Sequence, residues 1–215
     1  MLEKTNNYFS DIRWDIINLI PAGKNKILEI GCGTGNTGKA LKEQGKAAEV
    51  VGIEKIPQEA ESARKNLNTV LTADIETIKM PFDKGYFDYI IAADILEHLY
   101  NPWLTISNLK AYIKKDGFII ASLPNIRNWR TVRGLIFKGD WNYSNAGLLD
   151  DTHIRFFTKK TMIKLFQSEG FTIHLITPRF KLEPGNRYNI LNNLTLRLLE
   201  EFWAEQYIIM ARKND

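Results

Sequence analysis

The chain has 215 residues, of which 44% are hydrophobic and 25% are charged, with 29 basic residues against 25 acidic ones. These values are typical of a globular protein and exclude a collagen, a disulfide-rich scaffold and an acidic disordered tail. The apolar runs are far shorter than the ~18 residues of a membrane span, and the N-terminus lacks an apolar secretory signal. We therefore expect a cytoplasmic protein without a transmembrane segment, and the single cysteine, Cys32, agrees with a reducing compartment.

The net charge of +4 is small, and most charged residues are interspersed along the chain. A nucleic-acid-binding surface usually has a denser cluster of Lys and Arg, so we expect no nucleic-acid partner. At roughly 150 residues per domain, the length predicts a single domain over 1–215. The oligomeric state is left open.

Apolar residues at helical spacing predict an amphipathic N-terminal helix over 5–20, which ends at Pro21. Short apolar runs predict buried strands at 26–30, 50–54, 70–73, 87–93, 118–122, 171–176 and 206–211. Segments with helical periodicity predict helices at 36–44, 57–66, 103–115, 158–168 and 191–202. Because strands alternate with helices, we expect a doubly wound, mostly parallel α/β sheet with helices on both faces.

Ligands of an open α/β sheet bind beyond the carboxyl ends of the strands. The first loop at that end contains Gly31, Gly33 and Gly35 and precedes the helix that begins near Asn36. Glycine lets the backbone turn sharply and approach a ligand, and the N-terminus of a helix attracts anionic groups. The spacing is Gly-x-Gly-x-Gly, whereas a dinucleotide fingerprint requires Gly-x-Gly-x-x-Gly.

Acidic residues lie at the ends of the first two predicted strands and directly after the third. Glu29 would repel a pyrophosphate but suits a ligand that carries an ammonium or sulfonium charge. Glu54 can accept hydrogen bonds from both hydroxyls of a ribose, or it is a surface residue of the loop. Asp74 can accept a hydrogen bond from the exocyclic amine of an adenine, or it forms a turn.

The segments ILEIGCGTGNTG, GIEKI, TADIE and FDYIIAADILEHL occur in this order, and together they resemble the class I S-adenosylmethionine-dependent methyltransferases. The resemblance implies a Rossmann-like sheet of seven strands in which 206–211 is the antiparallel strand. It implies S-adenosylmethionine as the cofactor, with an ammonium group oriented by Glu29, a ribose held by Glu54 and an adenine amine bound by Asp74. The residues implied in cofactor binding are Glu29, Gly31, Gly33, Gly35, Glu54, Ile56, Asp74, Ile75, Ala93 and Asp94.

The segments ADILEH, SLPN and GLLDDTHIRFFT further resemble bacterial small-molecule methyltransferases related to the ubiquinone-pathway O-methyltransferases. An oxygen acceptor must lose a proton, so a general base is expected near the methyl group. His98 and His153 are the candidate catalytic residues, although each can instead be a structural histidine. His174 and Cys32 are interpreted as structural. No His-x-x-His or Cys-x-x-Cys pair occurs, so we expect no metal site.

The connection over 125–157 is long for an α/β unit and lies at the ligand end of the sheet, so we expect it to be the acceptor lid. Within it, Arg127, Arg130 and Arg133 recur at every third residue. Guanidinium groups can bind carboxylate or phosphate in a bidentate manner, which favours an anionic acceptor. A solvated helix face and a membrane-surface contact are the alternatives.

These patterns predict a methyltransferase that acts on a small molecule or a glycan precursor, with oxygen as the expected methylated atom. One alternative is a nicotinamide-dependent dehydrogenase, against which Glu29 and the glycine spacing argue. The other is a methyltransferase-like module that binds the cofactor or a partner without catalysis, because a fold alone does not determine a function. The identity of the acceptor is left open.

Overall fold

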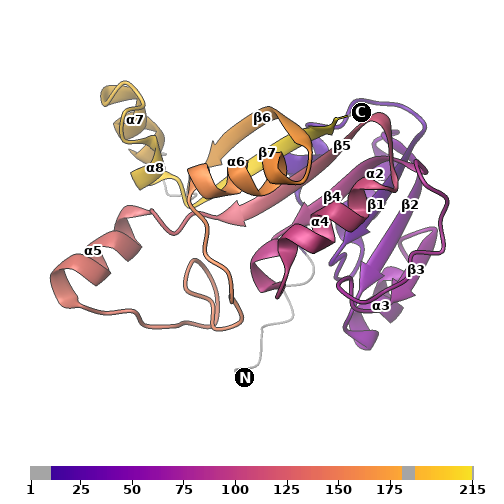
Figure 1. The fold of residues 1–215 in the computed structure, drawn as a ribbon, viewed down its shortest axis with the longest axis horizontal. Helices are drawn as coiled ribbons and strands as arrows, with labels where there is room; N and C mark the ends of the chain where they lie inside the picture. The colour runs from indigo at the N-terminus through magenta and orange to yellow at the C-terminus, as the bar shows by residue number, and fades with distance from the viewer. Residues whose placement is uncertain (1–10, 181–186, 215) are drawn as a thin grey trace.

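The structure, a computed structural model, describes residues 11–180 and 187–214. Its seven-stranded sheet has the strand order β3-β2-β1-β4-β5-β7-β6 (Figure 1). Neighbouring strands are parallel except for β7, which runs antiparallel to both β5 and β6. The strands are β1 (Asn25–Ile30), β2 (Ala47–Glu54), β3 (Thr69–Thr72), β4 (Phe87–Ala93), β5 (Ile113–Pro124), β6 (Phe171–Arg179) and β7 (Gln206–Lys213). The predicted sheet and its single reversed strand are confirmed.

Helices flank the sheet on both faces, as predicted. They are α1 (Trp14–Ile17), α2 (Asn36–Glu43), α3 (Pro57–Ala63), the 3-10 helix η1 (Leu96–His98), α4 (Pro102–Lys110), α5 (Trp129–Lys138), α6 (Lys159–Ser168), α7 (Arg187–Leu194) and α8 (Glu200–Trp203). In Figure 1, α4 and α6 lie in front of the sheet.

The sheet is buried on both faces because successive residues of a strand point to opposite sides. In β1, Leu28 and Ile30 belong to the core that contains the buried residues of α4 and α6. Ile27 belongs to the second core, together with Ile16 of α1 and Leu41 of α2. Each fully buried aliphatic side chain contributes roughly 1.5–3 kcal/mol to stability. Because both faces are occupied, the loops at the carboxyl ends of the strands form the place where a ligand can bind.

The predicted helix over 103–115 is too long, because α4 ends at Lys110 and β5 already begins at Ile113. The ladder between β4 and β5 pairs Phe87 with Ile113 and then Tyr89 with Phe118, so β5 carries an irregularity between these two pairs. Asp116 lies in it with a φ of 64°. Asp116 and Gly117, directly after the predicted helix, therefore form part of a bulge inside β5.

Two other predicted helices are wrong in extent. The helix over 191–202 is divided into α7 and α8, because Leu196 and Arg197 have φ angles of 49° and 63° and cannot continue a right-handed helix. Of the helix over 5–20, residues 5–10 lie outside the described residues, and the remainder forms only α1. Arg13 precedes α1 with φ −85° and ψ 70°, which is not a helical conformation. Its backbone N–H donates a hydrogen bond to the Thr37 hydroxyl and not to a carbonyl oxygen of a preceding helical turn.

After β5 the chain leaves the sheet to form α5 and then a long connection that leads to α6. Figure 1 shows α5 extending away from the sheet, on the same side as α7 and α8. Asn125 and Phe157 form a bridge that holds the two ends of this connection together at the carboxyl end of β5. In the parts of the chain that the structure describes, no helix is long and apolar enough to cross a membrane.

Candidate active site

The glycine loop after β1 is held over the end of β2. The backbone N–H of Gly31 donates to the carbonyl oxygen of Ile53 at 2.8 Å. Gly31, Gly33 and Gly35 have φ angles of 66°, 51° and 76°, a region that glycine enters without penalty. At Gly35, a Cβ atom would lie 2.9 Å from Cγ of Leu67. The loop conformation therefore depends on glycine.

Cys32 lies within this loop and is buried. A Cβ atom on Gly52 of β2 would lie 2.6 Å from its Sγ, so the thiol packs closely against that strand. Burial and the nearby carboxylates of Glu29 and Glu54 raise the pKa of the Cys32 thiol. A neutral, packed thiol is a structural residue and a poor nucleophile.

Glu54 ends β2 and connects the glycine loop to the second strand. Its Oε2 accepts a hydrogen bond from the backbone N–H of Gly33 at 2.9 Å, and its Oε1 accepts one from Ile56 at 2.9 Å. The side chain is buried. A carboxylate oxygen has further lone pairs, so this residue can still accept a hydrogen bond from a bound ribose.

Glu29 is the penultimate residue of β1 and is buried beneath the first turn of α2, next to Gly38. A hydrogen bond from the Gly38 backbone stabilises its charged form, but burial outweighs it and raises the pKa of Glu29 to about 8. Its Oε2 has no hydrogen-bond partner among the described residues. A buried polar oxygen without a partner is costly, so a cationic or hydrogen-bonding group of a ligand fits here.

Asp74 follows β3 and already has two partners. Its Oδ2 forms an ion pair with Nζ of Lys55 at 2.8 Å, and its Oδ1 accepts a hydrogen bond from the backbone N–H of Glu76 at 2.9 Å. The hydrogen bond from Lys55 holds the pKa of Asp74 below its usual range. Nearby, Ile56 is 38% exposed and offers an apolar surface on which an adenine can pack, whereas Ile75 packs against the core.

Asp94 follows Ala93 at the end of β4 and connects four segments of the chain. Its carboxylate forms an ion pair with the guanidinium of Arg13 and accepts hydrogen bonds from the Ser122 hydroxyl and the Gln206 amide, each at 2.9 Å. Its φ of 52° is unusual for a residue other than glycine. Sequence reasoning missed Arg13, Ser122 and Gln206, because no local pattern marks a residue whose partner lies far along the chain.

His98 and His153 lie against each other at the same end of the sheet. Their ring centroids are 4.8 Å apart. The contact forms because the backbone N–H groups of Ile154 and Arg155 both donate to the carbonyl oxygen of Glu97 at 3.0 Å. These hydrogen bonds hold the end of the 125–157 segment against η1. The structure therefore brings the two predicted catalytic histidines together.

The tautomers of both rings follow from their acceptors. Nδ1 of His98 lies 3.1 Å from the carbonyl oxygen of Thr152, and Nδ1 of His153 lies 3.3 Å from the carbonyl oxygen of Leu148. A carbonyl oxygen only accepts hydrogen bonds, so we assign the proton of each neutral ring to Nδ1. The lone pair then lies on Nε2 of both rings, which is the atom that can act as a base or as a ligand.

Glu97 completes this cluster. Its side chain is 1% exposed, and neither carboxylate oxygen has a hydrogen-bond partner in the described part of the chain. Burial, reinforced by the Asp94 carboxylate, raises the pKa of Glu97 well above its usual range. One ligand atom each from Glu97, His98 and His153 lies within 4.8 Å of the others. No closely spaced pair of histidines in the sequence marks this cluster, because His153 lies in a loop far from His98 along the chain.

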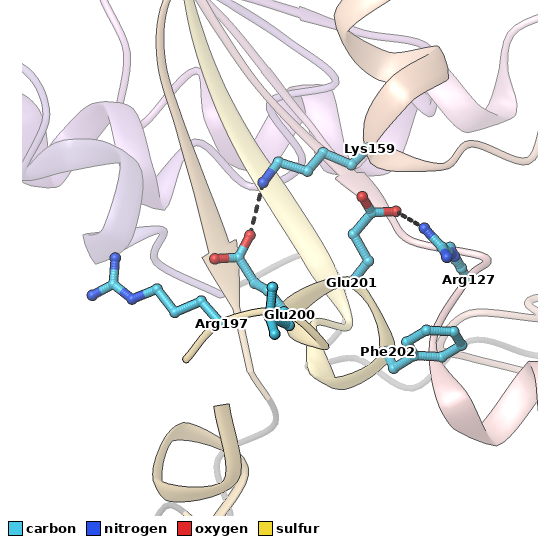
Figure 2. Close-up of a pocket in the computed structure, with 7 residues that line it drawn as sticks. Arg127, Lys159, Arg197, Glu200, Glu201 and Phe202 are labelled. Carbon is cyan, nitrogen blue, oxygen red and sulfur yellow. Dashed lines mark hydrogen bonds and ion pairs between the residues drawn. The ribbon is translucent and has the colours of Figure 1, made fainter. Parts of the chain in front are cut away.

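A pocket of about 290 Å³ lies between the start of the 125–157 segment and α8. Figure 2 shows its charged side chains in pairs: Arg127 with Glu201, and Lys159 with Glu200, each at 2.8 Å. Arg197 also lines the pocket, so its cations exceed its carboxylates by one.

The remaining arginines of the 125–157 segment also have partners. Arg130 pairs with Glu205 at 2.7 Å, Arg133 lies over the ring of Trp129, and Arg155 donates to the carbonyl oxygen of Tyr100. Arg127, Arg130 and Arg155 therefore also anchor this segment to the rest of the chain, whereas the partner of Arg133 lies in α5 itself.

A sheet of this order, with a reversed seventh strand, a glycine loop after β1 and a buried acid at the end of β2, defines the class of Rossmann-like S-adenosylmethionine-dependent methyltransferases. The family model described as a methyltransferase domain matches residues 6–176, and the chain belongs to this family.

Individual relatives agree with this assignment. The chain is 26% identical over 186 residues to a ubiquinone biosynthesis O-methyltransferase of Burkholderia vietnamiensis, covering 79% of this chain and 77% of that protein. It is 29% identical over 164 residues to an uncharacterized methyltransferase of Geobacillus sp., covering 74% and 76%. In fold it is similar to a SAM-dependent methyltransferase from Archaeoglobus fulgidus, with a TM-score of 0.67 and 18% identity over 94% of this chain and 91% of that one.

The protein is therefore an S-adenosylmethionine-dependent methyltransferase, and S-adenosylmethionine is its cofactor. The described residues fit this cofactor in two respects. The glycine loop has no side chains at three positions, so a ligand can approach its backbone closely at the end of β2. The unpartnered Oε2 of Glu29 suits a cationic group of that ligand. The alternative of a nicotinamide-dependent dehydrogenase is excluded by the family.

Proposed function

We propose that this methyltransferase transfers the methyl group to an oxygen atom of a small-molecule acceptor, and that the acceptor binds beside His98 and His153. The observation that carries the proposal is the contact between these two imidazoles at the end of β4, next to Asp94. The carbonyl oxygens that face Nδ1 of both rings favour the tautomer with the lone pair on Nε2. The relation to a ubiquinone biosynthesis O-methyltransferase supports oxygen as the methylated atom.

The proposed roles of the chain's own residues are positioning and proton removal. The cofactor, when bound, supplies a methyl group on a sulfonium ion. We propose that Gly31, Gly33, Gly35, Glu54, Ile56, Asp74, Ile75, Ala93 and Asp94 hold the cofactor, with Glu29 oriented toward its ammonium group. Fixing the two reactants relative to each other can supply roughly 7–11 kcal/mol of the barrier. A base at His98 or His153 can add 10²–10⁴-fold in rate, by order of magnitude.

We propose that residues 125–157 form the acceptor side of the site. The segment carries His153 and is held against η1 by two backbone hydrogen bonds. The pocket lined by Arg127, Lys159 and Arg197 retains one cation in excess of its carboxylates, which favours an anionic acceptor such as a glycan precursor.

The test is a turnover assay with labelled cofactor against phenolic, sugar and carboxylic-acid acceptors. We expect methyl transfer to a hydroxyl group, and we expect His98→Ala to lower the rate by ~10²-fold or more with unchanged cofactor affinity. His174→Ala is the matched control, because that histidine is exposed on β6. Cofactor binding without transfer to any acceptor would instead support a catalytically silent binding module.

A further inference from the structure

We propose that Glu97, His98 and His153 bind a divalent metal ion of the zinc class. The inference deepens the proposed function, because the ion would lie where we place the acceptor oxygen. The ligand set comes from two segments: η1 supplies Glu97 and His98, and the loop before α6 supplies His153.

The distances suit an ion after a small movement of side chains. One ligand atom from each residue lies within 4.8 Å of the others, and His153 Nε2 lies 3.9 Å from Glu97 Oε1. With ligands ~2.0–2.1 Å from zinc, neighbouring ligand atoms of a tetrahedral site are about 3.4 Å apart. The three side chains therefore need to close by roughly 0.5–1.4 Å.

The histidines have the hydrogen bonds that metal ligands usually have. A metal-bound imidazole commonly donates its other ring N–H to a backbone carbonyl or a carboxylate, which fixes the tautomer and directs the lone pair at the ion. Nδ1 of His98 faces the carbonyl oxygen of Thr152, and Nδ1 of His153 faces that of Leu148. The Thr152 hydroxyl also lies near Nδ1 of His98 and donates to Asp150 at 2.6 Å.

Glu97 supplies the independent observation. Its carboxylate is almost completely buried, and both oxygens have no hydrogen-bond partner in the described ranges. Buried charges in proteins are normally paired or coordinated to a metal. The nearby cation, Arg13, is directed at Asp94 and Asp15. A metal ion between Glu97 and the two imidazoles would satisfy the carboxylate.

The ligand types indicate the metal and its use. Two imidazoles with one carboxylate form a set that zinc commonly takes, and three protein ligands leave one position open for an exogenous oxygen. A metal ion lowers the pKa of an oxygen bound to it. In the proposed step, the acceptor hydroxyl loses its proton to solvent, its oxygen forms the bond to the methyl carbon, and the carbon–sulfur bond breaks with its electron pair left on sulfur. The histidines then act as ligands rather than as general bases.

The test uses cobalt(II) as a coloured substitute for zinc. The 215-residue chain is treated with a chelator, dialysed and titrated with Co²⁺ alone, and visible absorption bands report coordination. We expect binding of one ion per chain. Glu97→Gln and His153→Ala should each weaken it by at least ~10-fold, and His174→Ala should leave it unchanged.

Two further measurements on the Glu97→Gln variant distinguish loss of the metal site from loss of the fold. Glu97→Gln keeps the shape of the buried side chain, and its circular dichroism and S-adenosylmethionine affinity show whether the variant is folded. Absence of cobalt bands in the wild type at millimolar Co²⁺, or equal binding by folded Glu97→Gln, would overturn the metal site. Neither measurement needs an acceptor, so the metal site can fail while the proposed O-methylation stands, and the proposed O-methylation can fail while the metal site stands.

Discussion

Glu54 accepts a backbone hydrogen bond on each carboxylate oxygen, from Gly33 and from Ile56. Glu54→Gln would place an amide N–H against one of these donors. A buried donor without an acceptor costs ~1–3 kcal/mol. We expect the variant to bind S-adenosylmethionine ~10-fold or more weakly, as measured by isothermal titration calorimetry.

Glu49→Gln is the matched control for this prediction. Glu49 lies on the same strand, but its carboxylate contacts Lys26 and Tyr86, away from the glycine loop. Cofactor affinity should therefore be unchanged in this variant. Equal affinities for Glu54→Gln and the wild type would show that Glu54 does not position the loop.

Glu29 should make the stability of the cofactor-free protein depend on pH. Its folded-state pKa is raised from 4.5 to about 8, because burial disfavours the charged form. The folded state therefore binds more protons than the unfolded state between these values. The stabilisation is fully present below pH ~4.5 and is lost as the pH rises through ~8, with a slope of at most about 1.4 kcal/mol per pH unit.

Urea unfolding of the wild type and Glu29→Gln at pH 5.5, 7 and 8.5 measures this effect. The free energy of unfolding of the wild type should fall more steeply with pH than that of the variant, since glutamine does not titrate. Parallel pH profiles for the two proteins would contradict a buried, protonated Glu29.

S-adenosylmethionine should bind the wild type more tightly as the pH rises toward 8, because the ammonium group of the cofactor favours the ionised form of Glu29.

At the scale of elements, ion pairs attach the 125–157 segment to the region of α8. Arg127 pairs with Glu201 and Arg130 pairs with Glu205. Arg127→Glu would place two carboxylates side by side, so the segment should become more susceptible to limited proteolysis. The double variant Arg127→Glu/Glu201→Arg should restore the wild-type cleavage pattern.

The same pair of variants separates anchoring from acceptor binding. If Arg127 only anchors the segment, the charge-swapped protein should regain the wild-type KM for the acceptor. If the guanidinium itself binds an anionic acceptor, the KM should stay raised in the swapped protein, with cofactor affinity unchanged. Cleavage patterns that do not differ between wild type and Arg127→Glu would contradict the anchoring role.

At the scale of the whole molecule, ligand binding should stabilise the fold selectively. S-adenosylmethionine and its demethylated product at 100 times their dissociation constants should each stabilise the protein by about 2.7 kcal/mol. NAD should give no shift in a thermal unfolding experiment, because the loop lacks the dinucleotide spacing and Glu29 lies beneath it. Stabilisation by NAD alone would contradict the assignment of the cofactor loop.

The sequence by itself determined the order of the strands along the chain and the position of the cofactor loop. Both are local: apolar runs define buried strands, and Gly31, Gly33 and Gly35 can adopt positive φ angles wherever the chain is placed. The acids Glu29 and Glu54 could also be identified from the sequence, because Glu29 is the penultimate residue of an apolar strand and Glu54 is the last residue of another.

Only the tertiary structure decided which distant residues meet. Arg13 reaches Asp94 across the end of the sheet, His153 packs against His98, and the α8 glutamates pair with Arg127 and Lys159. Element boundaries at 103–115 and 191–202 also depended on it, since a bulge and two left-handed residues override local periodicity. These features arise from contacts between segments far apart in the chain, and a pattern of neighbouring residues carries no information about such contacts.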